Sequence, residues 1–258
     1  MNNVKNYVVG QHYKVKSTQW SWKDTKDEGD QYVAYKKMYQ LSRASLTKFL
    51  EGPWEEICFE GEIDFIGQAA KKSLTLIKEL WHKEPCNILV LGPDCQMVQN
   101  TKIFDQFNEF RMFNWTDPKS HDGNNPWNYS LPNYFNGDML YYPHTLTSNF
   151  WEKFDSLCEN WVIDNTVSTW GNDQIVNNIL FWEQGLTWEQ AHQSKLFYQA
   201  QWIPIWAPIE IQDQWNGCLS TEAHIIHWHA SRHIPTKLAA MENINEVLDI
   251  PEYVGILK

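Results

Sequence analysis

The stretch Asn87-Ile88-Leu89-Val90-Leu91-Gly92-Pro93-Asp94 decides the fold of this chain. A short apolar run that is stopped by turn residues predicts a strand buried on both faces, as in a parallel sheet. Ligands of open α/β sheets gather at the carboxyl ends of such strands. Asp94 is therefore a candidate for holding a metal, a ribose or a phosphate-bound cation, although an Asp here is also common as the cap of a turn.

The residues before this strand predict further elements of a parallel sheet. Apolar residues have helical spacing over 31–50 and 64–82, and Gly52-Pro53 ends the first of these helices. Short strands are expected near 7–9 and over 56–61. The alternation of helices and strands predicts right-handed crossovers and a parallel sheet in the first hundred residues.

The second half of the chain mixes strands and helices. It is expected to contain strands at 110–113 and 134–142, helices at 147–161 and 172–184, an apolar piece at 202–206 and a His-rich strand end at 224–229. No repeat or Pro/Gly/Ser linker marks a boundary, so a single domain is expected over 1–258, with a nucleotide-binding half at about 1–100 and an acceptor- and sugar-binding half at about 101–258.

Composition excludes several classes of function. The formal charge of −11 argues against coating nucleic acid by phosphate neutralisation. No apolar run approaches the roughly 20 residues of a membrane helix, and the first residues lack the apolar stretch of a signal peptide. Five cysteines without a Cys-x-x-Cys pair favour free thiols in a reducing compartment, so a cytoplasmic location is expected.

Two further segments carry directed polar groups. Gly137, inside the apolar strand that holds Asn136, indicates a bulge or the close approach of a ligand, or else an ordinary kink. Asp173 and Gln174 fall in the first turn of a predicted helix, with Asn177 one turn on. Such side chains suit sugar hydroxyls, although an acid at this place also compensates the helix dipole.

The last segment is rich in histidine: His224-Ile225-Ile226-His227-Trp228-His229, followed by His233. Alternation along a strand places His227 and His229 on one face, opposite Ile226 and Trp228. Imidazole together with a carboxylate suits Mn²⁺, Zn²⁺ or Fe²⁺. The alternative is a strand with partly buried, hydrogen-bonded histidines.

In this order, the motifs resemble those of the GT-A-fold glycosyltransferases, in particular the glycogenin- and galactosyltransferase-like family. That family has an apolar strand ending in Asp-x-Asp, an Asn-Ala-Gly strand, an Asp-Gln pair with a downstream Asn, and a C-terminal His-Phe-x-Gly-x-x-Lys-Pro segment. The counterparts here are Gly92-Pro93-Asp94, Asn136-Gly137, Asp173-Gln174 with Asn177 or Asn178, and His227-Trp228-His229 leading to Pro235 and Lys237.

The resemblance implies a GT-A-like α/β domain with a mostly parallel central sheet flanked by helices. It implies a metal, Mn²⁺ or Mg²⁺, held by Asp94 and His227, with His229 as a further ligand. Asp173 and Gln174 would be catalytic. Substrate would be bound by Asn136, Gly137 and Asn177, with Lys237 or Arg232 on the phosphates.

The resemblance further implies transfer of a hexose from a nucleotide-sugar, expected to be UDP-linked, to a glycan or other hydroxyl acceptor. Gly92 stands where the family has the first Asp of its motif, and Ala230 replaces a Gly of the last segment. These departures motivate an alternative, a catalytically inactive GT-A-like binding module. A second alternative is a metalloprotein built on His224, His227, His229 and His233.

Overall fold

The computed structural model describes residues 4–15, 28–64, 67–116, 134–161, 172–187, 197–199, 224–228 and 234–254. Within them, a five-stranded sheet has the order β2-β1-β3-β6-β5 and a three-stranded sheet has the order β4-β8-β7. The strands are β1 (Lys5–Val15), β2 (Glu55–Ile63), β3 (Cys86–Leu91), β4 (Cys95–Met97), β5 (Arg111–Thr116), β6 (Tyr134–Tyr142), β7 (Phe197–Gln199) and β8 (Ile225–His227). The helices are α1 (Glu28–Phe49), α2 (Gly67–Lys83), α3 (Ser148–Trp161), α4 (Asn172–Glu183), α7 (Ile234–Val247) and the short 3-10 helix η2 (Ile103–Asp105).

The central sheet is mostly parallel, as the sequence predicts. β1 is parallel to both β2 and β3, whereas β6 is antiparallel to β3 and to β5. Four of the five strands therefore run in one direction, and β6 runs against them. Because β6 comes from the second half of the chain and pairs with β3, strands of both halves share this sheet.

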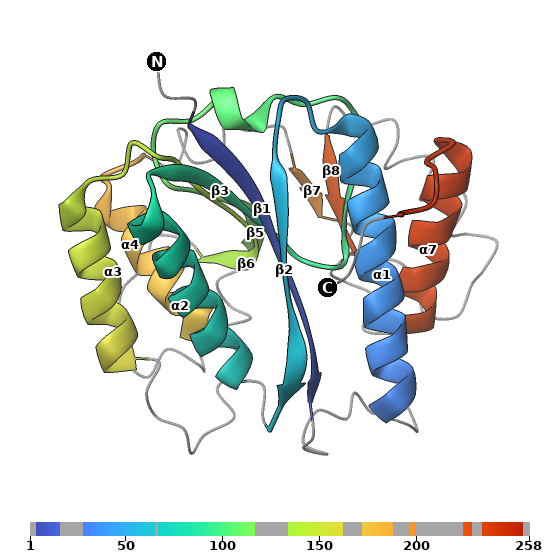
Figure 1. The fold of residues 1–258 in the computed structure, drawn as a ribbon, viewed down its shortest axis with the longest axis horizontal. Helices are drawn as coiled ribbons and strands as arrows, with labels where there is room; N and C mark the ends of the chain where they lie inside the picture. The colour runs from blue at the N-terminus through green and yellow to red at the C-terminus, as the bar shows by residue number, and fades with distance from the viewer. Residues whose placement is uncertain are drawn as a thin grey trace.

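Helices cover both faces of the central sheet (Figure 1), with α2, α3 and α4 on one side and α1 and α7 on the other. Alternate strand residues explain this layering, because successive side chains of a strand point to opposite faces. Ile88 and Val90 belong to the core beneath α2, α3 and α4, whereas Leu89 and Leu91 belong to the core beneath α1. The apolar run of β3 is thus buried on both faces, as predicted.

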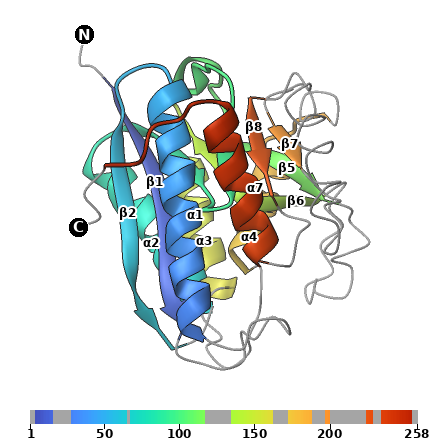
Figure 2. The same ribbon diagram turned by 90° about the vertical axis from the view of Figure 1, so that its right-hand side faces the viewer.

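A third core joins the three-stranded sheet to α1 and α7. It lies where α1 and α7 stand side by side next to β8 (Figure 2), and it includes Met38 of α1, Ile226 of β8 and Met241 of α7. Through this core, the C-terminal helix and the His-bearing strand are fixed against the first helix of the chain.

The predicted elements are confirmed where the structure describes them, and apart from β1 their ends are displaced by up to three residues. The helix predicted over 64–82 begins at Gly67, and Gly52, with a φ of 100°, follows the end of α1. β1 is longer than the predicted strand near 7–9, and β4 was not predicted at all. The apolar piece at 202–206 lies outside the described residues. None of the described helices is long and apolar enough to cross a bilayer.

A glycine in β1 allows a buried arginine to lie on the sheet. A Cβ atom at Gly10 would come within 1.9 Å of Arg43 Nη2. Arg43 is fully buried, donates to the carbonyl oxygen of Leu91 at 3.1 Å and lies 3.2 Å from Glu56 through its Nε. A bare backbone at position 10 therefore permits a contact that holds the carboxyl end of β3.

Candidate metal and substrate site

The carboxyl end of β3 places Asp94 inside the protein. All six residues of β3 are buried, and Gly92-Pro93 turns the chain so that Asp94 is itself 7% exposed. β4 follows at once with three buried residues. The turn therefore places a carboxylate between two buried strands, and the surroundings of that carboxylate decide its chemistry.

Pairing of β4 with β8 brings His227 to this turn from 133 residues further along the chain. In the antiparallel register, Cys95 is opposite His227, and the backbone N–H of Trp228 donates to the Asp94 carbonyl at 3.0 Å. Ile226 and Trp228 point into the third core, as the predicted alternation requires. His227 is consequently on the opposite face, toward Asp94.

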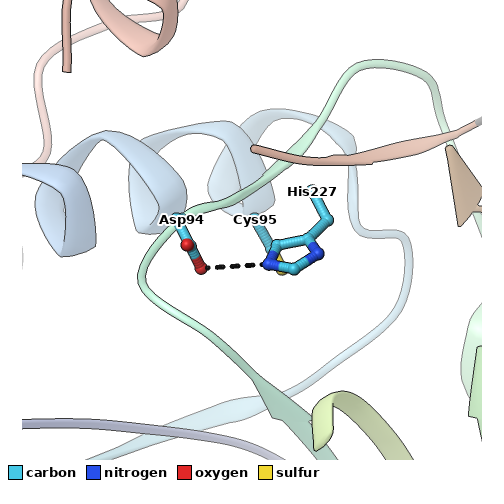
Figure 3. Close-up of side chains that lie close together, drawn as sticks. All are labelled: Asp94, Cys95 and His227. Atoms are coloured by element: carbon cyan, nitrogen blue, oxygen red, sulfur yellow. Dashed lines mark ion pairs between the residues drawn. The ribbon is translucent and has the colours of Figure 1, made fainter. Parts of the chain in front are cut away.

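The imidazole of His227 faces two carboxylates through one nitrogen, and Figure 3 shows its contact with Asp94. Its Nε2 atom is 3.5 Å from Asp94 Oδ1 and 3.1 Å from Asp138 Oδ2. The side chain of His227 has no exposure, whereas that of Asp138 is 31% exposed. The cluster is thus closed on the His227 side and open to solvent at Asp138.

Lys237 of α7 completes the charge balance. Its Nζ donates to Asp94 Oδ2 at 2.6 Å, on the oxygen that does not face His227. Burial alone would raise the pKa of Asp94, but Lys237 and His227 outweigh it and hold that pKa well below its usual range. Asp94 is therefore ionised, and it is bound to a positive charge of the protein itself.

Opposing effects also act on His227. Burial alone would lower its pKa, but the charges of Asp138 and Asp94 outweigh burial and raise the pKa to about 9. Without a bound metal ion, His227 is consequently an imidazolium at neutral pH, and its Nε2 faces both carboxylates.

A buried amide aligns the elements that carry these groups. Gln96 Nε2 donates to the carbonyl of Met241 and to Asn245 Oδ1, both at 2.8 Å, and Gln96 Oε1 accepts from Trp228 Nε1 at 2.8 Å. One side chain of β4 thereby ties α7, which carries Lys237, to the end of β8. Sequence reasoning missed this residue, because a lone Gln within a short strand carries no pattern.

The donor atoms present fit a divalent cation. Among the described residues, Asp94, Cys95 and His227 form the group whose donor atoms all lie within 4.8 Å of one another. Burial raises the pKa of the Cys95 thiol well above its usual range. The carboxylate and imidazole are then the better ligands, and this set suits Mn²⁺. His224 is not part of the group, and His229 and His233 lie outside the described residues.

Asp138 was not predicted as a site residue, although it follows Asn136 and Gly137, which were. A signal was present, because a carboxylate inside an otherwise apolar strand is unusual. The sequence could not show that the Asp138 carboxylate lies at the carboxyl end of β3. That placement follows from the β3–β6 register, in which Leu91 is opposite Met139.

Gly137 does mark a close approach, and its partner is a predicted site residue. A Cβ atom at Gly137 would lie 2.9 Å from Gln174 Cγ. The β5–β6 register shifts between the pairs Met112–Leu140 and Asn114–Asn136, so β6 has two more residues than β5 in the interval that contains Gly137, and the predicted bulge lies there. Gln174 thus packs on the strand next to Asp138, and Asp173 lies in the same first turn of α4, as predicted.

Asn177 and Asn178 make contacts within the protein. Asn177 is 1% exposed, and its Oδ1 accepts from the Tyr142 hydroxyl at 2.6 Å. Asn178 Oδ1 accepts from the Phe135 N–H at 2.8 Å, and its Nδ2 donates to the Phe135 carbonyl at 2.7 Å. These contacts fix α4 to β6, and the predicted sugar contact of Asn177 stays a prediction.

The remaining predicted site residues have no described side chain. Asn136 is placed only as part of β6, and Asp173 only as part of α4. His229 and Arg232 lie outside the described residues. Their predicted roles in binding metal and phosphate remain predictions.

The fold matches that of a known galactosyltransferase. The galactosyltransferase LgtC, solved in complex with donor and acceptor sugar analogues, superposes with a TM-score of 0.50 at 10% sequence identity, over 98% of this chain and 98% of LgtC. A glycosyltransferase involved in glycosylation of the major capsid of PBCV-1 gives 0.49 at 11% identity, over 93% of this chain and 99% of that one. GlyE of Streptococcus pneumoniae TIGR4 gives 0.44 at 14% identity, over 99% of this chain and 67% of GlyE.

Comparison of the sequence adds no relative. No protein-family model matches the chain, and no curated protein matches it by sequence. The fold class is therefore established by structure alone: the chain has the GT-A-like α/β fold, with a mostly parallel central sheet between helices.

Proposed function

We propose that this protein is a metal-assisted glycosyltransferase that moves a hexose from a nucleotide-sugar to a glycan or other hydroxyl acceptor. The observation that carries the proposal is the meeting of Asp94 with His227, 3.5 Å apart, at the carboxyl end of a central strand of a GT-A-like sheet. In open α/β sheets, this is the edge at which ligands bind.

Asp94 and His227 are the residues that would hold the divalent cation, with His229 as a further candidate. When bound, such a cation stabilises the charge that develops on a leaving diphosphate. The chain supplies the anchoring, because Lys237 holds one oxygen of Asp94 at 2.6 Å and leaves the other toward His227. A fixed carboxylate loses little freedom when it binds a ligand.

We assign the sugar side of the site to the start of α4. Gln174 packs on Gly137 next to Asp138, so a donor sugar over this strand would meet its amide. Asp173 in the same turn is proposed as the second catalytic group, and Asn136 as a substrate contact. Arg232 is proposed to bind the phosphates of the donor. Lys237 is proposed to act on the phosphates indirectly, by holding the Asp94 carboxylate in place.

The proposal is tested by thermal unfolding with UDP-hexoses, with and without Mn²⁺. A ligand at a hundredfold excess over its Kd adds about 2.7 kcal/mol of stability, which raises the Tm by roughly 5 °C or more in a chain of this size. Failure of every nucleotide and nucleotide-sugar to raise the Tm, with or without Mn²⁺, would show that the proposal is wrong.

The matched variant is Asp94→Asn, which keeps the shape of the side chain. It is expected to abolish the Mn²⁺-dependent part of the Tm shift, measured as the difference between liganded and unliganded samples of the same variant. The control is Asp105→Asn, which removes an exposed carboxylate and should keep the full Mn²⁺-dependent Tm shift.

A second candidate, an inactive GT-A-like binding module, is favoured by one observation. Lys237 already neutralises Asp94, and Gly92 contributes no carboxylate. The two candidates differ in turnover: release of hexose from a nucleotide-sugar above the protein-free rate contradicts the binding module. Nucleotide-sugar binding without any turnover, to acceptor or water, contradicts the enzyme.

A further inference from the structure

The space beside Gly92 is filled by the carboxylate of another strand. An ideal Cβ atom at Gly92 would lie 3.2 Å from Asp138 Cβ, 3.2 Å from Asp94 Oδ1 and 3.3 Å from Asp138 Oδ1. The Gly92 N–H donates to the Asp138 carbonyl at 2.7 Å, which continues the antiparallel register of β3 and β6 by one step. Gly92 and Asp138 are therefore direct neighbours across the two strands.

Asp138 and Asp94 both contact the imidazole of His227. His227 Nε2 is 3.1 Å from Asp138 Oδ2 and 3.5 Å from Asp94 Oδ1. Two ligands that bind one Mn²⁺ or Mg²⁺ ion at right angles, with bonds of about 2.1 Å, lie about 3 Å apart. The distances from the imidazole nitrogen to each carboxylate therefore match those between neighbouring metal ligands. The Asp138 carboxylate is not in the group of donor atoms that all lie within 4.8 Å of one another, so it would turn toward Asp94 when the two share an ion.

The side chains of His227, Asp94 and Asp138 differ in exposure, so the site is open to solvent on one side only. His227 and Asp94 are 0% and 10% exposed, whereas Asp138 is 31% exposed. An ion that enters from solvent would meet Asp138 first and would keep its open positions on that side. Substrate oxygens can bind at such positions, as they do at metal sites that retain exchangeable water.

We propose that Asp138 supplies the carboxylate that Gly92 lacks, so that a divalent cation is held by Asp94, Asp138 and His227. In the motif pattern given above, Gly92 stands at the first Asp of Asp-x-Asp, and Asp138 stands at the Gly of Asn-Ala-Gly. The carboxylate and the glycine have thus exchanged places across one strand pair. The role of this ion in transfer rests on the proposed function, whereas its binding does not.

Mn²⁺ alone is the probe, with bound and free ion separated by electron paramagnetic resonance on the full chain. Asp138→Asn, which keeps the side-chain shape but removes the charge, is expected to weaken Mn²⁺ binding by roughly one to two orders of magnitude, because ligand charge sets affinity. Asp105→Asn is the control for ions that gather on exposed carboxylates, and it should bind like the wild type.

A reciprocal exchange provides the second test. Gly92→Asp alone is expected to bind Mn²⁺ no better than the wild type and to lower the Tm, because its Cβ would crowd Asp138 Cβ at 3.2 Å. Adding Asp138→Gly removes that crowding and returns one carboxylate to the site, so G92D/D138G should bind Mn²⁺ at least tenfold more tightly than Asp138→Asn.

Three results would overturn the inference. They are a wild type that binds no Mn²⁺, an Asp138→Asn variant with wild-type affinity, and a folded double variant that remains as weak as Asp138→Asn. In each case, the contacts of His227 would be structural ion pairs only. Mn²⁺ binding at this site without any nucleotide-sugar binding would leave the inference standing and contradict the proposed function. Nucleotide-sugar binding by a wild type that binds no Mn²⁺ would overturn the inference and leave hexose transfer standing without its metal.

Discussion

The imidazole of His12 lies in a setting that disfavours its charge. It is 4% exposed in β1, next to the aromatic rings of Tyr32 and Tyr39, and its Nδ1 is 3.7 Å from Cys58 Sγ. Glu60 on the neighbouring strand is the counter-force, with its Oε2 3.2 Å from His12 Nε2. Burial and the Glu60 carboxylate act in opposite directions on the pKa of His12. The larger of the two effects determines whether the protein gains or loses stability as the pH falls.

Burial dominates, so stability should fall as the pH is lowered. Desolvation lowers the pKa of His12, Glu60 raises it less, and Lys36 and Arg43 lower it further. The unfolded chain then binds more protons than the folded protein below the unfolded pKa of about 6.5, and the contribution of neutral His12 is lost as the pH falls toward the folded pKa. Between pH 7.5 and 5.5, the wild type should lose more unfolding free energy in urea than His12→Gln.

Subtracting the two pH dependences cancels the groups that both proteins share. If Glu60 dominated instead, the wild type would gain stability on acidification relative to the variant. Equal losses in both proteins would show that His12 titrates alike in the folded and unfolded states.

Helix α4 is joined to the sheet by side-chain amides that imitate a strand. Gln184 accepts from the Phe110 N–H and donates to the Phe110 carbonyl, both at 3.0 Å, and Asn178 does the same at Phe135. The β3–β6 register ends at Met139, so the backbone of Phe135 lies beyond the last paired residue of β3. The amide of Asn178 satisfies backbone groups that β3 does not reach.

Asn178→Ala is therefore expected to lower the free energy of unfolding by about 3 kcal/mol, because it leaves buried backbone N–H and carbonyl groups without hydrogen bonds. Urea unfolding followed by tryptophan fluorescence measures the loss. Asn108→Ala, at an exposed position, should change the stability by no more than about 0.5 kcal/mol. A loss at Asn178 as small as that at Asn108 would show that water replaces the amide.

Two apolar cores lie on opposite faces of one sheet, and each contains a fully buried thiol. Cys86 belongs to the core under α2, α3 and α4, and Cys95 to the core under α1. The strands β3 and β6 contribute side chains to both cores, so loss of one core removes support from the other. We expect the described fold to unfold as one cooperative unit.

Alkylation of the two thiols tests this expectation. Burial raises the pKa of Cys86 to about 12 and that of Cys95 well above its usual range, so neither should react with iodoacetamide at pH 8 while folded. In rising urea, peptide mass spectrometry should show both thiols becoming labelled at the same midpoint. Separate midpoints would mean that the two layers unfold independently.

The sequence by itself determined the elements and one half of the site. Local patterns suffice for this, because an apolar run stopped by Gly-Pro specifies a buried strand and its end, and helical spacing specifies α1 and α2. Asp94 could be identified from its place after that strand, and His227 from its dense histidine neighbourhood. Strand β4 is too short for periodicity to reveal it.

Only the tertiary structure decided which charges meet. His227 and Lys237 reach Asp94 through the β4–β8 pairing and the docking of α7 on Gln96, and Asp138 reaches His227 through the β3–β6 register. These contacts join residues 89 to 143 positions apart, and a shift of one residue in either register would turn His227 or Asp138 to the opposite face. For that reason the sequence alone indicated only that Gly92 supplies no carboxylate, whereas the fold places the Asp138 carboxylate beside Gly92.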